Sequence, residues 1–214
     1  MTANMPSRAK NEPRIEDDAL VRGLGRFMDD PRLPNQAYAA FVRSPHAHAR
    51  IKAVDTAAAR AAKGVLAVLT AADIKAAGVG SISRHPPVAG KGGAKMVMPF
   101  RPALAGDKVM HGGDPVAMVV AETLAAALDA ADMVTVDYEE LPAVVDLNTA
   151  MKGKTHLYPE APGNLCVDWP GPVADESNEK TVADIIAKAA HVARVTVTNQ
   201  RMVVASMETR GATG

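Results

Sequence analysis

The chain has 214 residues, of which 48% are hydrophobic and 22% are charged, a composition typical of a soluble globular protein that can bury a core. Its 24 Lys and Arg side chains balance 24 Asp and Glu side chains, which excludes a strongly basic surface for nucleic acid or an anionic membrane. The single cysteine, Cys166, excludes an internal disulfide framework and a multi-cysteine iron–sulfur site. We expect a cytoplasmic protein, because the sequence shows neither an apolar signal-peptide core nor the roughly 18 apolar residues that span a bilayer.

The first part of the chain alternates strand and helix patterns. Residues 1–19 are polar and charged and are predicted to be a flexible lead-in. Apolar residues with strand-like spacing, and alanine-rich stretches bounded by Asp or Thr and by Gly, then follow one another. They predict a strand over 36–43, a strand over 49–54, a helix over 57–62, a strand over 65–69 and a helix over 71–77.

A long irregular segment over 78–107, rich in glycine, proline and lysine, divides this part from the next. A loop of that length inside a domain is typically functional or forms a contact surface. The pattern then predicts a strand over 116–121, a helix over 124–131 capped by Thr123, a strand over 134–138 and an extended piece over 143–145. The residues alone indicate a compact α+β or α/β unit.

The last part begins with a proline- and glycine-rich stretch over 152–178, predicted to be an extended linker. A helix is predicted over 180–190, with Val182, Ile185 and Ile186 on one side. A strand is predicted over 192–205. Since no later strand follows it, either it pairs with earlier strands or another polypeptide completes the sheet.

Two glycine clusters lack the features of a phosphate-binding loop. Gly23-Leu24-Gly25 has no third glycine and no helix pattern after it. In Gly90-Lys91-Gly92-Gly93 no Ser or Thr follows the lysine, and the position five residues before Gly90 is His85 instead of glycine. We interpret the second cluster as a flexible loop.

The histidines do not complete a metal site in the sequence. His46 and His48 lie two apart on an extended segment, so both could face one ligand. No third ligand with suitable spacing follows, and a structural role is favoured. His111, beside two glycines, is interpreted as a turn residue.

The remaining candidates for chemistry are interpreted in the same way. Asp137, Glu139 and Glu140 cluster at a predicted strand end and indicate a solvated edge instead of an acid–base pair. Cys166 has no neighbouring histidine or basic cluster that would stabilise a thiolate. Glu208 and Arg210 are predicted to form a local ion pair or an interface contact. No catalytic, cofactor-binding or metal-binding residue is therefore assigned.

Several separate strings, in the same order, closely resemble the start of the large, molybdopterin-binding subunit of the xanthine dehydrogenase, aldehyde oxidase and aerobic carbon monoxide dehydrogenase family. The resemblance runs from about residue 13 to the last residue, with Asp114 where Glu is common and Thr209 where Pro is usual. The strings are Gly25–Asp30 (GRFMDD), Tyr38–Ile51 (YAAFVRSPHAHARI), Gly64–Thr70 (GVLAVLT), Gly113–Ala117 (GDPVA), Val136–Val144 (VDYEELPAV), Pro159–Leu165 (PEAPGNL), Asn199–Arg201 (NQR) and Met207–Gly211 (METRG).

The resemblance implies an α+β fold, with an α/β hammerhead domain over 20–146, a linker over 147–179 and the truncated start of a molybdopterin-binding domain over 180–214. It implies a structural and assembly role in an oxidoreductase that hydroxylates aldehydes or N-heterocycles with water, or oxidises carbon monoxide. The family's pterin-binding, substrate-site and catalytic motifs map onto no residue of this chain. We therefore expect the isolated chain to be inactive.

The resemblance also implies partners and cofactors of the complete enzyme. The partners are the remainder of the molybdopterin-binding subunit, an iron–sulfur subunit and a flavin subunit, without nucleic acid or membrane. Molybdenum–molybdopterin, in its plain or cytosine-dinucleotide form, belongs to the complete enzyme, and iron–sulfur clusters and FAD belong to partner subunits or domains. Two alternatives stay open: a non-catalytic fragment that only binds a partner chain, and a small-ligand-binding domain that uses the 78–107 loop.

Overall fold

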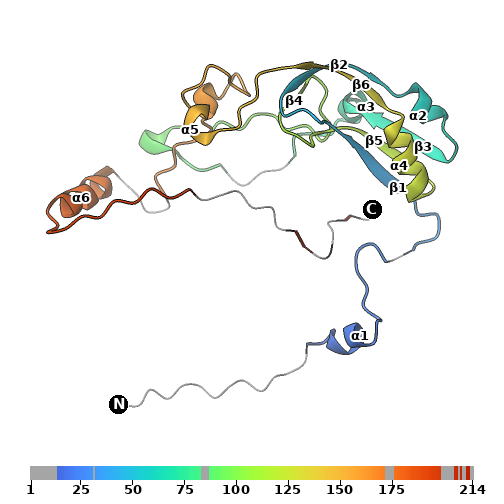
Figure 1. The fold of residues 1–214 in the computed structure, drawn as a ribbon, viewed down its shortest axis with the longest axis horizontal. Helices are drawn as coiled ribbons and strands as arrows, with labels where there is room; N and C mark the ends of the chain where they lie inside the picture. Colours follow the sequence, from blue (N-terminus) through green and yellow to red (C-terminus); the bar gives the residue numbers. More distant parts are fainter. Residues whose placement is uncertain are drawn as a thin grey trace. The chain divides into compact units, whose positions relative to one another are not determined.

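The structure, a computed structural model, describes residues 14–30, 32–82, 87–171, 176–198, 205–206, 208 and 211–212. These residues belong to two units, one made of Met1–Pro34 with Val195–Gly214 and the other of Asn35–Arg194. Figure 1 shows the helices and strands of both along the chain. No helix in the described ranges is long and apolar enough to cross a membrane.

Two three-stranded sheets form the centre of the Asn35–Arg194 unit (Figure 1). Sheet A contains β1 (Tyr38–Arg43), β5 (Pro115–Ala121) and β3 (Val65–Thr70) in that order, and sheet B contains β4 (Lys108–Val109), β2 (Ala49–Asp55) and β6 (Thr135–Glu140) in that order. Every pairing is antiparallel. The fold is therefore α+β, which confirms the fold class implied by the resemblance and decides against a parallel α/β sheet.

Strand β2 departs from the strict alternation that the sequence predicts. Ala49 and Ile51 are buried, but Ala53 is exposed. In the pairing with β6, Ile51 lies opposite Tyr138 and Ala53 opposite Asp137, so Lys52 is an extra residue on one strand. Such a bulge reverses the faces to which the following side chains point.

Two helices cover one face of sheet A. They are α2 (Ala57–Ala61) and α4 (Leu124–Asp132), both predicted from the sequence. The core between these helices and the sheet is formed by Ala59, Val68, Ala117, Val119, Ala130 and Val134. Alanine on both helices lets the helix backbones approach the valines of the strands closely. A second cluster joins the two sheets. It contains Ala49, Ile51 and Val109 of sheet B, Ala105 of the loop before β4, and Val116 of β5 in sheet A.

Side chains at the predicted positions satisfy the free N–H groups of two helices. The Thr123 hydroxyl accepts a hydrogen bond from the Ala126 N–H at 3.1 Å. At α3 (Ala71–Ala76), the Asp73 carboxylate accepts from the backbone N–H of Thr70 at 2.7 Å and from its hydroxyl at 2.8 Å. The hydrogen bond from the Thr70 backbone, with that from the hydroxyl next, holds the pKa of Asp73 below its ordinary value of 3.8.

We expect the start of α3 to loosen in acid. Because the folded pKa of Asp73 is depressed, its stabilising contribution is present above the ordinary carboxyl pKa of 3.8 and is lost as the pH falls through the folded value. Hydrogen exchange of the Thr70 amide, measured along a descending pH series and corrected for intrinsic rates, should show this loss. The Asp73→Asn variant should show no such pH dependence at that amide, and an equal dependence in the variant would contradict the assignment.

The stretch over 147–179, predicted to be an extended linker, is instead partly folded. It contains α5 (Leu147–Ala150) and a short 3₁₀ helix, η2 (Pro162–Asn164). The Asn164 side chain holds them together: its Oδ1 accepts from the Leu157 N–H at 2.8 Å, and its Nδ2 donates to the carbonyls of Ala150 and Thr155, both at 2.9 Å. The prediction misses this order because side-chain amide bonds replace the periodic backbone pattern.

The irregular segment over 78–107 is anchored at several points, and its residues 83–86 lie outside the described ranges. A 3₁₀ turn, η1 (Lys91–Gly93), follows Gly90. The Lys91 N–H donates to the Asp168 carbonyl at 2.9 Å, and the Val97 N–H donates to the Cys166 carbonyl at 2.8 Å. This part of the loop is therefore tied to the segment that follows η2.

The expected C-terminal helix is present, but the described part of the strand expected after it is irregular. Helix α6 covers Glu176–Ala187, close to the predicted 180–190. Residues 192–198 form no strand, and Val195 and Val197 are 86% and 78% exposed. The rest of that prediction, over 199–204, lies outside the described residues. Alternating apolar residues favour a strand only when a neighbouring strand supplies hydrogen bonds, and 192–198 have none here.

The other unit joins the two ends of the sequence. Helix α1 (Asp17–Val21) begins inside the predicted lead-in, whose residues 1–13 lie outside the described ranges. Gly23, with φ of 70°, ends this helix. The Met28 N–H donates to the Glu208 carboxylate at 3.0 Å, across 180 positions of sequence. Glu208 therefore makes a long-range contact, and its predicted partner Arg210 lies outside the described residues.

Candidate functional site

A hydrogen-bonded cluster of polar residues lies where the chain passes from sheet A to sheet B. Ser44 is only 3% exposed there. Its backbone N–H donates to the Asp114 carbonyl at 2.9 Å, and its own carbonyl accepts from the Gly113 N–H at 2.8 Å. The Ser44 hydroxyl accepts from the His46 N–H at 3.0 Å and donates to the His46 carbonyl at 3.1 Å. The turn is therefore fixed from both sides.

His48 is buried in this cluster, with 7% of its surface exposed. Its Nδ1 lies 2.8 Å from the Pro142 carbonyl, which can only accept, so Nδ1 carries the proton. Its Nε2 is buried and has no hydrogen-bond partner among the described residues. The His48 ring thus joins the start of β2 to the end of β6.

His46 points elsewhere. Its ring meets the Tyr138 ring edge-on, with 4.9 Å between centroids, and its Nδ1 lies 3.4 Å from the Glu140 carboxylate. The two histidines therefore have separate partners and do not face one ligand. Their placement favours the structural role that the sequence indicates.

Tyr138 is ionised less readily than an ordinary tyrosine. Burial raises its pKa above 10.0, a hydrogen bond with the Ser44 side chain opposes the rise, and the charge of Asp114 adds to it. A raised folded pKa means that the fold favours the neutral phenol.

We expect the protein to lose stability in alkali because of Tyr138. The contribution of the neutral phenol is complete below pH 10.0 and is lost as the pH rises through the folded pKa. Urea midpoints of the wild type and of Tyr138→Phe, measured from neutral to alkaline pH, should converge as the pH passes that range. Parallel curves would show that another group causes any alkaline loss.

Four further candidates occupy exposed positions. His111 lies in the turn before β5, 3.7 Å from the Asp114 carboxylate, which also accepts from the Met110 N–H at 3.0 Å. Asp137, Glu139 and Glu140 lie along β6 and are exposed. Glu139 forms a 3.6 Å ion pair with Arg50. These groups stabilise turns and strand surfaces and do not converge on one point.

Lys91 of the glycine cluster and Cys166 also have partners of their own. The Lys91 ammonium lies 3.9 Å from the Asp168 carboxylate, so a carboxylate already faces the cation of the glycine cluster. Cys166 is partly buried, and its backbone carbonyl accepts the hydrogen bond from the Val97 N–H of the 78–107 loop. No group of three His, Cys, Asp or Glu side chains in the described part of the chain is arranged to hold a metal.

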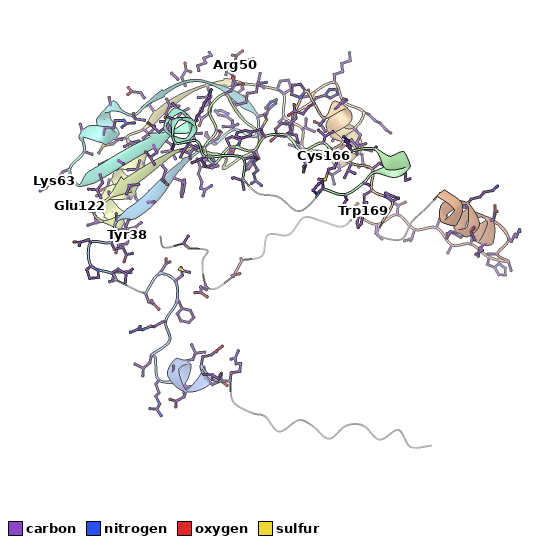
Figure 2. All side chains as sticks on the ribbon, turned by 180° about the vertical axis from the view of Figure 1, so that it is seen from behind. Tyr38, Arg50, Lys63, Glu122, Cys166 and Trp169 are labelled. Carbon is purple, nitrogen blue, oxygen red and sulfur yellow. The ribbon has the colours of Figure 1, made fainter. Side chains whose placement is uncertain are left out.

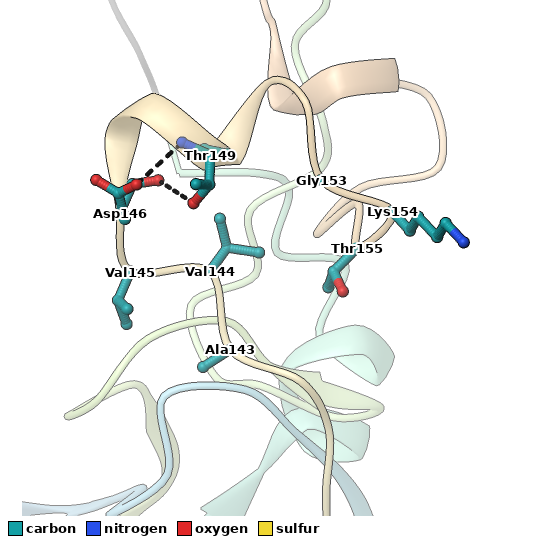
Figure 3. A pocket seen from close by; sticks show the side chains of 9 residues that line it. Ala143, Val144, Val145, Asp146, Thr149, Gly153, Lys154 and Thr155 are labelled. Carbon is teal, nitrogen blue, oxygen red and sulfur yellow. Dashed lines mark hydrogen bonds between the residues drawn. The ribbon is translucent and has the colours of Figure 1, made fainter.

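A shallow pocket of about 170 Å³ lies between the end of sheet B and α5 (Figure 3). Val144, Asp146 and Lys154 are among its lining residues. The Asp146 carboxylate accepts from the Asn148 and Thr149 N–H groups at 3.3 and 3.1 Å. The Thr149 side chain, with these N–H groups, holds the pKa of Asp146 below 3.8. The sequence analysis missed the pocket because it exists only once Asn164 has folded the segment.

The pocket is smaller than the roughly 300–1,000 Å³ typical of small-molecule sites. Its one carboxylate, Asp146, is engaged by the α5 N-terminus. This pocket therefore offers neither the space nor the ligands for a molybdopterin-sized cofactor.

Comparison with known sequences identifies the fold. Residues 22–142 match the family described as "Aldehyde oxidase and xanthine dehydrogenase, a/b hammerhead domain". The nicotine 6-hydroxylase large subunit of Paenarthrobacter nicotinovorans is 37% identical over 202 residues, which cover 94% of this chain and 23% of that protein. The carbon monoxide dehydrogenase large chain of Afipia carboxidovorans is 43% identical over 149 residues, which cover 70% of this chain and 16% of that protein.

Solved structures agree with these matches. Reconstituted CO dehydrogenase from Oligotropha carboxidovorans superimposes with a TM-score of 0.57 at 42% identity, over 67% of this chain and 16% of that one. Quinoline 2-oxidoreductase from Pseudomonas putida 86 gives a TM-score of 0.59 at 36% identity, over 67% of this chain and 18% of that one. The chain thus spans between 16% and 23% of the length of these relatives. It belongs to the aldehyde oxidase and xanthine dehydrogenase family and carries that family's hammerhead domain.

Proposed function

We propose that this chain supplies the N-terminal, architectural part of a molybdenum hydroxylase large subunit. The observation that carries the proposal is the match to large subunits of which the chain spans only 16–23%. Within that span, Ser44, Thr123 and Asn164 hold a strand junction, a helix start and a folded loop in place. The chain's contribution is therefore to fold a domain on which the rest of the subunit assembles.

The proposal divides the chain as the resemblance does. The lead-in covers 1–19, the hammerhead 20–146, the linker 147–179 and the start of the molybdopterin-binding domain 180–214. Helix α6 crosses the boundary between the last two segments, and Val182, Ile185 and Ile186 on its apolar side are 47–64% exposed, which supports a partner that covers this helix. An amphipathic helix of this kind gains stability only when a partner covers that side.

The complete enzyme is proposed to be a cytoplasmic oxidoreductase that hydroxylates an aldehyde or N-heterocycle with water or oxidises carbon monoxide. Molybdenum–molybdopterin would be held by the remainder of the large subunit, and iron–sulfur clusters and FAD by the iron–sulfur and flavin partners. No step of the reaction is assigned to this chain.

Purification from the source cell tests the proposal. The tagged chain should co-purify with a protein similar to the rest of the carbon monoxide dehydrogenase large chain, or should be continuous with such a sequence, and the complex should contain stoichiometric molybdenum and iron. The 214-residue chain produced alone should oxidise no aldehyde, N-heterocycle or carbon monoxide. Recovery of a metal-free chain without such a protein would contradict the proposal and favour the non-catalytic alternative.

A further inference from the structure

Sheet A has apolar side chains on both faces. In the central strand β5, Ala117 and Val119 point toward α2 and α4 and belong to the core beneath those helices. Their neighbours Met118 and Val120 therefore point to the opposite face, because side chains alternate along a strand. An antiparallel sheet with one solvated face normally carries polar residues there.

The opposite face continues across all three strands. Met118 lies between Phe41 on β1 and Leu69 on β3, and Val120 lies between Ala39 and Ala67. Leu66 is the extra residue at the bulge of β3, beside this row. We call this surface the outer face of sheet A, and it consists of Ala39, Phe41, Leu66, Ala67, Leu69, Met118 and Val120.

The outer face is open in the structure. Phe41 is 44% exposed and Leu66 is 58% exposed. Figure 2 shows the molecule from behind and labels Tyr38, Lys63 and Glu122 at one end of sheet A. Its defined residues include no charged side chain. At the edge of this face, the Arg43 guanidinium lies over the Phe41 ring, 5.5 Å from the ring centroid, and donates to the Gly113 carbonyl at 2.9 Å.

We propose that the outer face of sheet A is an interface for the remainder of the large subunit, which contributes an apolar surface of its own. This inference rests on the proposed function. The occupant follows from length: in the relatives, the matching segment makes up 16–23% of one chain, so most of the polypeptide lies outside it. A face of apolar side chains, with a cation only beside Phe41 at its edge, favours a lasting interface over a transient contact, since lasting interfaces are the more hydrophobic ones.

Hydroxyl-radical footprinting read by mass spectrometry tests the interface. The chain produced alone is compared with the same chain purified from the source cell. Labelling of Phe41, Leu66 and Met118 should fall in the source material toward that of Val119, which is 0% exposed in the isolated chain. Leu124 and Leu128, which are 50% and 52% exposed on α4 behind the sheet, are the internal reference and should keep more of their labelling.

A pair of double variants adds a binding measurement. Phe41→Ser/Leu66→Ser should weaken capture of the large-subunit remainder by at least about tenfold, because two exposed apolar side chains leave the interface. Leu124→Ser/Leu128→Ser, matched in exposure, should leave capture close to that of the wild type. Both double variants should retain the thermal midpoint of the wild-type chain within a few degrees. If one of them does not, the footprinting of the unaltered chain alone tests the interface.

The outcomes separate the two proposals. Capture of a large-subunit remainder with unchanged labelling of Phe41, Leu66 and Met118 overturns the interface and leaves the proposed function intact. Protection of the outer face by a second copy of this chain, or by a different subunit, overturns the named occupant. Absence of any large-subunit remainder from the purified material overturns the proposed function and the interface together.

Discussion

The chain with Val119 replaced by aspartate is expected not to fold. Val119 is 0% exposed, lies in the central strand of sheet A between Ala40 and Val68, and belongs to the core beneath α2 and α4. A carboxylate there has no partner, and burying it costs several kcal/mol. A domain is stabilised by only about 5–15 kcal/mol in total. Circular dichroism and the thermal transition of the purified variant would reveal the loss.

Phe41→Asp is the matched control for that substitution. It places the same carboxylate in the same sheet, but on a side chain that is 44% exposed. We expect this variant to fold when produced alone, with a loss of less than about 1 kcal/mol of unfolding free energy. If both variants unfold, or both melt like the wild type, the assignment of an inner and an outer face to sheet A is wrong.

The second large effect is expected at Asn164. Asn164→Ala removes one acceptor and two donors that join the Leu157 N–H and the Ala150 and Thr155 carbonyls, and it places alanine at φ of 54°. Lost bonds of this kind and backbone strain together cost about 2–4 kcal/mol. Residues 147–165 should become open to protease and to hydrogen exchange while sheets A and B keep their protection.

Two variants separate the causes at this position. Asn164→Gly keeps the left-handed backbone available and removes only the side-chain amide, so it should retain most of the loss seen with alanine. Asn148→Ala removes an exposed amide whose side chain makes a single 3.4 Å contact with Asp146, and it should change stability by no more than about 0.5 kcal/mol. Protection of 147–165 in Asn164→Gly equal to the wild type would show that the amide does not hold the segment.

Local signals in the sequence located most helices and strands of the Asn35–Arg194 unit. Thr123 and Thr70 marked helix starts, Gly78 marked an end, and the apolar runs beginning at Val65 and Val116 marked the inner strands of sheet A. These signals predict the elements correctly because each depends only on residues that are close together in the sequence. The two-residue β4 was missed, because its pairing with Ala49 and Arg50 defines it and its own residues do not.

The arrangement of polar residues depended on distant parts of the chain. The spacing of His46 and His48 suggested a shared direction, but Tyr138 and Pro142, roughly ninety residues later, give the two rings separate partners. The order around Asn164 and the alternation broken at Lys52 likewise arise from tertiary contacts and strand register. Hydrophobic periodicity reports which face of an element is buried, and it does not report what covers that face.

The hydrogen bond from Met28 to Glu208 has a consequence for how the chain is made. Residues 35–194 are inserted between the two halves of the unit that this bond joins. During synthesis, the inserted unit is complete in sequence before the ribosome adds Glu208. The N-terminal part of the other unit can therefore complete its contacts only after sheets A and B are able to form. A nascent chain released before Glu208 is added would contain residues 35–194 in full, but its Met28 N–H would lack the Glu208 carboxylate.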